Sequence, residues 1–241
     1  MGIRQNIALY KKINWVKTLY FNFKKFPFSV AKKLPVFFYG KVKFQNISGT
    51  IIIDAPILPG MIQFGQQYEM ATISKGTAEI VIAGRVVFKG YAQFGKDVLL
   101  YVGKDAYAQF GNMTGLASNI QFICLEKIVL GEYARFGADS QIMDSHFHPM
   151  INTITKKVSN VNGEIVIGNY NYISSRVTIM PNTKTPDYCT IASNSLCNKD
   201  YTDLGQNILI GGITAKLLKQ NITRDWETEI PLLHKWLIVK L

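Results

Sequence analysis

Two histidines and an aspartate lie close together in the segment Asp144-Ser145-His146-Phe147-His148-Pro149. Imidazole titrates nearest to neutral pH of all side chains, so a positioned histidine can remove a proton from a hydroxyl group. A neighbouring carboxylate can orient the ring and fix its tautomer. The segment therefore indicates general acid–base chemistry, with Asp144 as the orienting group of a histidine base.

His146 and His148 are separated by one residue, and an extended backbone would turn both imidazoles to the same side. Such a pair could also begin a metal site. A catalytic zinc ion needs three protein ligands, however, and the third histidine, His234, lies far along the chain. We therefore expect no metal, and His146 has an alternative interpretation as an ordinary hydrogen-bonded loop residue.

The histidine segment interrupts a sequence that repeats every six residues. From Ile167 onward, an aliphatic or small residue recurs at this interval, at Ile167, Ile173, Ile179, Thr185, Ile191 and Cys197. A second, mostly small or β-branched set lies two positions before these residues, at Asn171, Val177, Thr183, Cys189 and Ser195.

A period of six excludes an amphipathic helix, because six residues advance a helix by about 240°. On a strand, six residues return to the same face. The repeat therefore predicts short strands, joined by tight turns, that stack into a parallel β-helix in which each coil buries its face against its neighbours.

The same period occurs earlier in shorter runs. These are Ile82 to Leu100, Val102 to Ile120 and Leu130 to Ile142, each stepping by six, and the triplet Gln-Phe-Gly recurs at 63–65, 93–95 and 109–111. The changes of register predict longer turns or bulges, with roughly six coils in total. Between Ile142 and Ile167 the period is lost, so we expect 144–163 to protrude as a functional loop.

Charge separates the first part of the chain from the rest. The 241 residues carry a formal charge of +11, but residues 1–53 hold ten Lys and Arg and no acid. The remaining 17 basic and 16 acidic residues nearly cancel, which argues against nucleic acid as a partner of the body. Lysines among many aromatic residues favour a helical segment, 1–45, at an anionic membrane surface. Packing against the body or a subunit contact is the alternative.

Neither a spanning segment nor a secretory signal is predicted, because no apolar run has the required length and pattern. Three cysteines without CxxC spacing, Cys124, Cys189 and Cys197, argue against a disulfide framework or a structural zinc site and fit a reducing compartment. We expect a cytoplasmic protein, with the inner face of the membrane as a place of contact.

With these features together, the sequence resembles the left-handed β-helix (hexapeptide-repeat) acyltransferases. The resemblance is carried by 167–175, 179–183, 191–195 and 198–200, and by the closing Gly211-Gly212-Ile213-Thr214-Ala215-Lys216. The segment 144–149 resembles the DxxFHP segment of the polysaccharide O-acetyltransferases, and 20–35 resembles the leader of that subgroup. Tyr172, Ser174, Ala192 and Thr214 depart from the usual residues of the family.

The resemblance implies an all-β fold, with a left-handed parallel β-helix at 48–213. The residues themselves predict a helical segment at 1–47 and a C-terminal tail at 214–241 that begins with a helix from Ala215 to Gln220. It implies transfer of an acetyl group from acetyl-CoA to a sugar hydroxyl of a cell-surface polysaccharide or its precursor. His148 matches the histidine of the family's HP motif and is the implied base. The implied acetyl-CoA contacts are Ser175, Ser193, Asn198, Lys199 and Lys216, and the implied assembly is a homotrimer with active sites between subunits.

Two other functions remain open within this fold. One is transfer to a different small acceptor, such as serine, an amino sugar or an antibiotic. The other is a metal-binding β-helix similar to the γ-type carbonic anhydrases.

Overall fold

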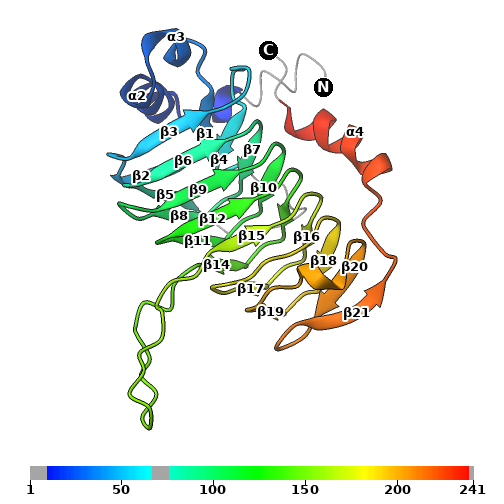
Figure 1. Cartoon of the computed structure of the whole chain (residues 1–241). Coiled ribbons are helices and arrows are strands. Elements are labelled where there is room, and N and C mark those ends of the chain that lie inside the picture. Colours follow the sequence, from blue (N-terminus) through cyan, green and yellow to red (C-terminus); the bar gives the residue numbers. More distant parts are fainter. Residues whose placement is uncertain (1–9, 67–75, 239–241) are drawn as a thin grey trace.

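The computed structural model describes residues 10–66 and 76–238, which form a three-sided coil of parallel strands with helices at its upper end (Figure 1). The helices are α2 (Trp15–Lys25), α3 (Phe28–Ala31) and α4 (Trp226–Leu237), and a short 3-10 helix, η1, spans Thr202–Leu204. Within the described part of the chain, no helix is long and apolar enough to span a bilayer.

Three sheets form the sides of the coil. The first has nine strands: β1 (Val36–Phe38), β4 (Ile62–Phe64), β7 (Ala92–Phe94), β10 (Thr114–Leu116), β13 (Arg135–Phe136), β16 (Tyr172–Ile173), β18 (Cys189–Ile191), β20 (Ile208–Gly211) and β21 (Lys216–Gln220). The second has seven: β2 (Lys41–Asn46), β5 (Thr77–Ile82), β8 (Leu99–Val102), β11 (Gln121–Cys124), β14 (Gln141–Met143), β17 (Thr178–Ile179) and β19 (Leu196–Cys197). The third has five: β3 (Thr50–Ile53), β6 (Arg85–Phe88), β9 (Tyr107–Phe110), β12 (Lys127–Leu130) and β15 (Ile165–Ile167).

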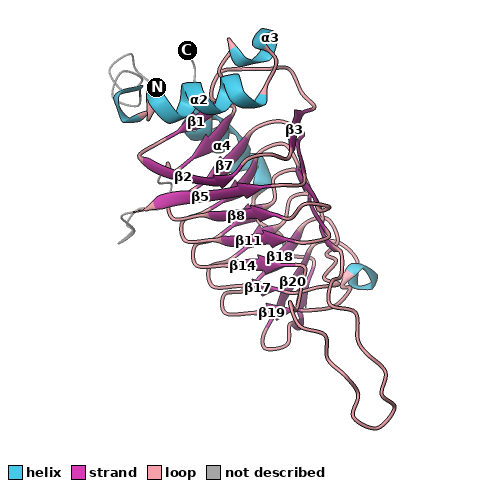
Figure 2. Ribbon diagram, turned by 90° about the vertical axis from the view of Figure 1, so that its left-hand side faces the viewer, coloured by secondary structure: helices cyan, strands magenta, loops and turns pink. Residues whose placement is uncertain are grey.

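From β1 to β20, consecutive strands lie on different sides, so each of these strands pairs in parallel with the strand one coil away. The five-stranded sheet counts five complete coils, and isolated bridges at Lys184 and Asp200 continue its side through later turns (Figure 2). The parallel β-helix expected from the six-residue period is confirmed. Its left-handed sense stays a prediction from the resemblance.

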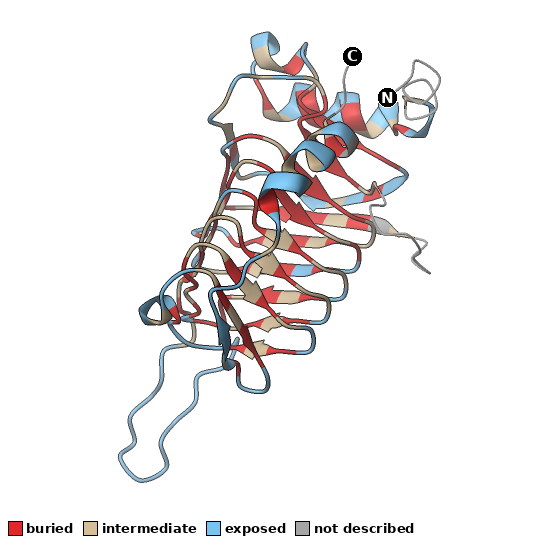
Figure 3. Cartoon of the chain, turned by 90° about the vertical axis from the view of Figure 1, so that its right-hand side faces the viewer, coloured by how far each residue is buried: buried red, intermediate tan, exposed pale blue. Residues whose placement is uncertain are grey.

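The core lies inside the coil and consists of the residues that define the repeat. The two late columns, from Ile167 to Cys197 and from Asn171 to Ser195, are buried throughout (Figure 3). Rings stack along the axis in the earlier coils, where the centroids of Phe64 and Phe94 are 4.3 Å apart. Short strands of period two place these side chains on one face and leave their neighbours partly exposed.

The late turns share one backbone feature, a residue with positive φ at every sixth position. Tyr170, Arg176, Asn182, Tyr188 and Asn194 follow at six-residue spacing and all have φ between 54° and 66°. This left-handed conformation is uncommon for residues other than glycine and is required at one position of several tight turns. The regular spacing of the turns therefore has a conformational basis as well as a hydrophobic one.

The N-terminal segment is only partly helical. α2 ends before Pro27 and α3 ends at Ala31, after which β1 joins the first sheet. The coil thus begins at Val36, ahead of the expected boundary at 48. Residues 1–9 of the expected helical segment lie outside the described part of the chain.

The C-terminal tail differs in one element from expectation. The sequence predicts a helix from Ala215 to Gln220, but Lys216–Gln220 form β21, which pairs antiparallel with β20 and covers the last edge of the first sheet. Pairing with an open strand edge outweighs the weak local helical preference of this stretch. α4 then runs back along the coil, and the carbonyl of Leu237 accepts a 2.9 Å hydrogen bond from the side chain of Gln63 on β4.

Candidate functional site

The protruding loop expected at 144–163 is a long hairpin that leaves the coil after β14 and returns at β15 (Figure 1). Antiparallel bridges join Ser145 to Asn162 near its base and Ile151 to Val158 nearer its tip. Its backbone is exposed from His146 to Asn160. Since the hairpin makes few contacts with the coil, its direction is set by its base.

Asp144 forms that base and is fully buried. Its Oδ1 accepts a hydrogen bond of 2.7 Å from the backbone N–H of Leu125, and its Oδ2 accepts bonds of 2.9 and 2.7 Å from Glu126 and Lys127. These donors belong to the turn between β11 and β12, one coil away. The expected pairing of Asp144 with an imidazole is absent from the described structure, where the carboxylate instead stabilises a turn.

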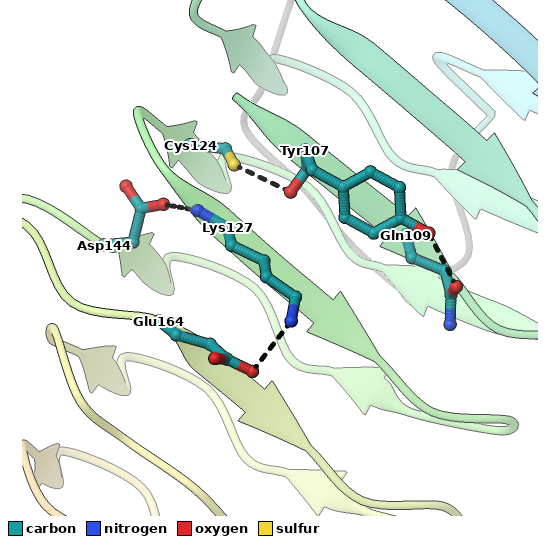
Figure 4. Close-up of polar contacts among 6 residues, drawn as sticks. All are labelled: Tyr107, Gln109, Cys124, Lys127, Asp144 and Glu164. Atoms are coloured by element: carbon teal, nitrogen blue, oxygen red, sulfur yellow. Dashed lines mark hydrogen bonds and ion pairs between the residues drawn. The ribbon is translucent and has the colours of Figure 1, made fainter. Parts of the chain in front are cut away.

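Lys127 contacts both ends of the hairpin (Figure 4). Its backbone N–H binds Asp144 before the hairpin, and its Nζ lies 3.2 Å from a carboxylate oxygen of Glu164 after it. The side chains of this ion pair are 45% and 35% exposed, so water weakens their attraction. The buried hydrogen bonds of Asp144 therefore hold the base more strongly than the ion pair does.

The two histidines lie in a tight turn. The N–H of His148 donates a 2.7 Å hydrogen bond to the carbonyl of His146, and Phe147 between them has φ of 60°. Ser145 Oγ accepts a 3.0 Å bond from the N–H of Phe147 and helps to close the turn. The extended backbone assumed for the histidine pair is therefore wrong.

Both histidines nevertheless line one open recess on the hairpin, with a volume of about 1080 Å³. Both residues are exposed, and neither ring has a hydrogen-bond partner among the residues that the structure describes. The rest of the lining is mixed, with polar groups from Asn152, Thr155, Lys157, Ser159, Asn160 and Asn182 and apolar side chains from Met150, Ile151 and Val158. The recess offers two free imidazoles beside several hydrogen-bonding groups, which is suited to a hydroxylated ligand.

Asn182 is the lining residue that the sequence did not indicate. It belongs to the coil rather than to the hairpin, and its N–H donates a 3.3 Å hydrogen bond to the carbonyl of Gly163. Its place in a six-residue turn marks it as structural, and the sequence carries no signal that the hairpin would fold beside it.

The expected acetyl-CoA contacts fall on different edges of the coil. Ser175 and Ser193 lie one coil apart in the turns from the first sheet to the second, which we call the first corner. Asn198 and Lys199 follow β19 in the turns from the second sheet to the third, which we call the second corner. The hairpin leaves the coil at this second corner. The two corners lie roughly 15–20 Å apart at about 3.3 Å per strand residue, so one copy does not bring all these residues together.

These side chains are chemically suited to coenzyme A. Ser193, Asn198, Lys199 and Lys216 are exposed, and Ser175 is half-buried, so all present polar groups outward. Regularly spaced hydroxyls along stacked coils can hydrogen-bond an extended amide-bearing arm, while lysines offset phosphate charge. Lys199 lies with its Nζ 5.5 Å from the ring centroid of Tyr201, and Lys216 begins β21.

His234 is used in packing. Its Nε2 lies 2.7 Å from the hydroxyl of Tyr133, which stacks on Tyr170 at 5.2 Å between ring centroids. No group of three or more His, Cys, Asp or Glu side chains suited to a metal ion occurs in 10–66 and 76–238. The three cysteines are buried and free.

The comparisons with known proteins give structural likenesses only. No family model matches the chain, and no curated protein matches it. The polySia-specific acetyltransferase NeuO is 18% identical, with a TM-score of 0.46 over 78% of this chain and 88% of that one. The polysialic acid O-acetyltransferase OatWY is 17% identical, with a TM-score of 0.42 over 77% of this chain and 91% of that one.

A third solved structure is a hexapeptide-repeat-containing acetyltransferase from Vibrio cholerae O1 biovar eltor, complexed with acetyl-CoA. It is 20% identical, with a TM-score of 0.40 over 58% of this chain and 68% of that one. This chain is similar to these proteins, and they are hexapeptide-repeat and polysialic acid acetyltransferases, the kinds of enzyme that its sequence resembles.

Proposed function

We propose that the protein is an acetyl-CoA-dependent O-acetyltransferase that acts on a sugar hydroxyl of a cell-surface polysaccharide or its precursor. The observation that carries the proposal is the pair of exposed histidines, His146 and His148, which line one open recess on a hairpin anchored to a parallel β-helix. The motif resemblance of 144–149 and of the late repeats supports the same reaction.

In this proposal His148 is the base. A sugar hydroxyl is a weak nucleophile near neutral pH, so His148 takes its proton as the hydroxyl oxygen attacks the thioester carbonyl. The coenzyme A thiolate leaves, and the acetyl ester remains on the sugar. His146 lies in the same recess and binds the acceptor or the developing oxyanion as a hydrogen-bond donor. Asp144 acts only through the position of the hairpin.

The acceptor site is suited to a glycan. The hairpin carries Lys156 and Lys157 and no acid between Ser145 and Gly163. Together with the amide and hydroxyl groups of the recess, these lysines favour a neutral or anionic sugar.

We also propose a homotrimer in which neighbouring copies complete each site. Cyclic symmetry places one surface of a copy against a different surface of the next. The second corner of one copy, with His148, then faces the first corner of another, with Ser175 and Ser193. Partly exposed apolar side chains form one registered column beside the second corner and support such a contact, at Tyr101, Ile123 and Met143.

A thiol-release assay with acetyl-CoA and a panel of acceptors tests the function. The panel includes an anionic polysaccharide, neutral oligosaccharides, serine and an amino sugar. We expect turnover with a polysaccharide and a loss of about 10²- to 10⁴-fold in His148→Ala, the usual contribution of a general base. His146→Ala should lose less activity than His148→Ala, because it removes a hydrogen-bond donor from the same recess but keeps the proposed base. Full activity of His148→Ala would contradict its assignment, and turnover with serine alone would favour the alternative acceptor class.

A further inference from the structure

α2 buries Phe21 in the core but leaves a second apolar stripe exposed. Its fully buried side chains include two polar ones, Thr18 and Asn22, both 0% exposed. Its outer side carries Val16, Leu19, Tyr20 and Phe23, which are 77%, 44%, 53% and 49% exposed. The spacing of these four residues, i, i+3, i+4 and i+7, places them on one stripe. A helix of a globular protein ordinarily buries such a stripe.

The polar side of α2 has a structural explanation. β1 is the edge strand of the first sheet, and α2 satisfies its outer backbone groups. Thr18 Oγ1 accepts a 3.2 Å hydrogen bond from the N–H of Phe38. Asn22 Oδ1 accepts one of 3.2 Å from the N–H of Val36, and its Nδ2 donates one of 2.8 Å to the carbonyl of Val36. Burying Thr18 and Asn22 is therefore required to close the end of the coil.

The apolar stripe has no such explanation within the described chain. Phe28, at the start of α3, is 71% exposed and its ring lies 6.1 Å from that of Phe23, so the apolar surface extends beyond α2. The surface lies at the end of the molecule opposite the hairpin tip (Figure 1). We name the five residues Val16, Leu19, Tyr20, Phe23 and Phe28 the outer α2 face.

Charge identifies what this face contacts. The segment that carries it is rich in exposed lysines, and residues 10–53 contain no acid, although Lys43 pairs with Glu79 of β5 at 3.5 Å. Exposed members of this group are Lys11, Lys12, Lys24, Lys32, Lys33, Lys41 and Lys43. Aromatic and aliphatic side chains that insert among lipid headgroups, ringed by lysines, match a bilayer surface rich in anionic lipid.

We propose that the outer α2 face is a docking surface for anionic membranes, with the apolar stripe inserted at the level of the headgroups. The proposal is independent of the acetyl-transfer reaction, because the face shares no residue with the recess of His146 and His148. It places the hairpin on the side of the protein away from the lipid.

Cosedimentation of the full chain with vesicles tests the proposal. Vesicles of phosphatidylcholine alone are compared with vesicles containing about 30% phosphatidylglycerol. We expect binding to the anionic vesicles only, and a loss of at least tenfold in Tyr20→Ser/Phe23→Ser. The matched control is Leu218→Ser/Leu232→Ser, at residues that are 48% and 49% exposed elsewhere, with unchanged binding.

A second pair of variants separates charge from insertion. Lys12→Gln/Lys24→Gln should weaken binding by about fivefold per lysine, and the control Lys104→Gln/Lys219→Gln should not. Circular dichroism and thermal melting establish that each variant is folded. Equal binding of wild type and Tyr20→Ser/Phe23→Ser, or absent binding of wild type, overturns the proposal. A fall in oligomer size in that variant, with vesicle binding retained, identifies the face as a contact between copies and also overturns it.

Discussion

The carboxylate of Asp144 accepts a 2.7 Å hydrogen bond from the backbone N–H of Lys127, and this contact joins the base of the hairpin to the neighbouring coil. Asp144, which the sequence indicates as the partner of a catalytic histidine, thus binds backbone N–H groups instead. The orientation of His148 then depends on a buried carboxylate that lies outside the recess.

Asp144→Ala should destabilise the protein by about 3 kcal/mol, because it leaves three turn N–H groups without their acceptor. Activity should fall even under conditions where the coil remains folded, since the hairpin loses its anchor. Urea unfolding and the thiol-release assay measure the two effects. Asp203→Ala, at an exposed residue, is the control and should change stability by less than about 0.5 kcal/mol. An equally stable Asp144→Ala would refute the anchoring role.

Lys127→Met separates the two contacts of Lys127. The variant keeps the backbone N–H that binds Asp144 and removes the ion pair with Glu164. Because that pair is partly exposed, we expect a loss below about 1 kcal/mol in the free energy of unfolding. Glu164→Gln should give a similar small effect, and a loss as large as that of Asp144→Ala would show that the ion pair holds the hairpin.

Trp226→Ala should lower stability by about 3 kcal/mol, since its ring is 6% exposed and contacts both Tyr133 and Tyr170. His234→Ala removes the hydrogen bond to Tyr133 and the ring contact with it, and should cost about 1 kcal/mol. Leu232→Ala, on the exposed side of α4, serves as the control for the loss of a side chain from this helix. Calorimetric melting compares the stabilities of the three variants. Equal melting temperatures would contradict this account of how α4 is attached.

The protein should lose stability at alkaline pH because of its buried thiols. Burial raises the pKa of Cys189 and of Cys197 from 9.0 to about 12. Between these values the unfolded thiol releases its proton and the folded one keeps it, so the free energy of unfolding falls as pH rises from 9 toward 12. The slope is at most about 1.4 kcal/mol per pH unit for each thiol.

Urea titrations at several pH values from 8 upward measure this slope. Cys189→Ala should reduce it, although the variant is less stable at every pH. An unchanged slope in Cys189→Ala would contradict the assignment to this thiol.

Sites shared between copies predict complementation. His148→Ala lacks the proposed base, and Ser193→Arg blocks the first corner, so each variant alone should be inactive. Mixed assemblies should regain activity, because some sites combine an intact second corner with an intact first corner. Co-expression of the two variants followed by the thiol-release assay tests this prediction. A monomer in light scattering would rule it out.

Ile123→Glu should dissociate the assembly by placing a charge in the outward apolar column.

The hexads made the coil predictable because each one is a local pattern with a direct physical meaning. The six-residue spacing alone predicts that Ile173 and Val177 point into the coil, and both are fully buried. The helix prediction for Lys216 to Gln220 was wrong because the conformation of this stretch depends on pairing with the open edge of β20, which a local sequence pattern does not contain.

The site was less predictable for a similar reason. The histidines could be chosen from residue type and spacing, but their turn depends on the positive φ of Phe147, which the sequence does not mark. The partner of Asp144 lies one coil away, and Asn182 enters the recess only because of how the hairpin returns. A sequence pattern that describes one coil at a time does not predict the contacts between coils.

The capped ends of the coil also bear on its length. Parallel strands that repeat this regularly could add further copies end to end and grow into a fibre, since every exposed edge is a template for the next strand. α2 blocks one end with the side chains of Thr18 and Asn22, and β21 blocks the other by running in the opposite direction. The same two elements that complete the fold therefore limit polymerisation, since end-to-end growth would require both ends of the coil to be open.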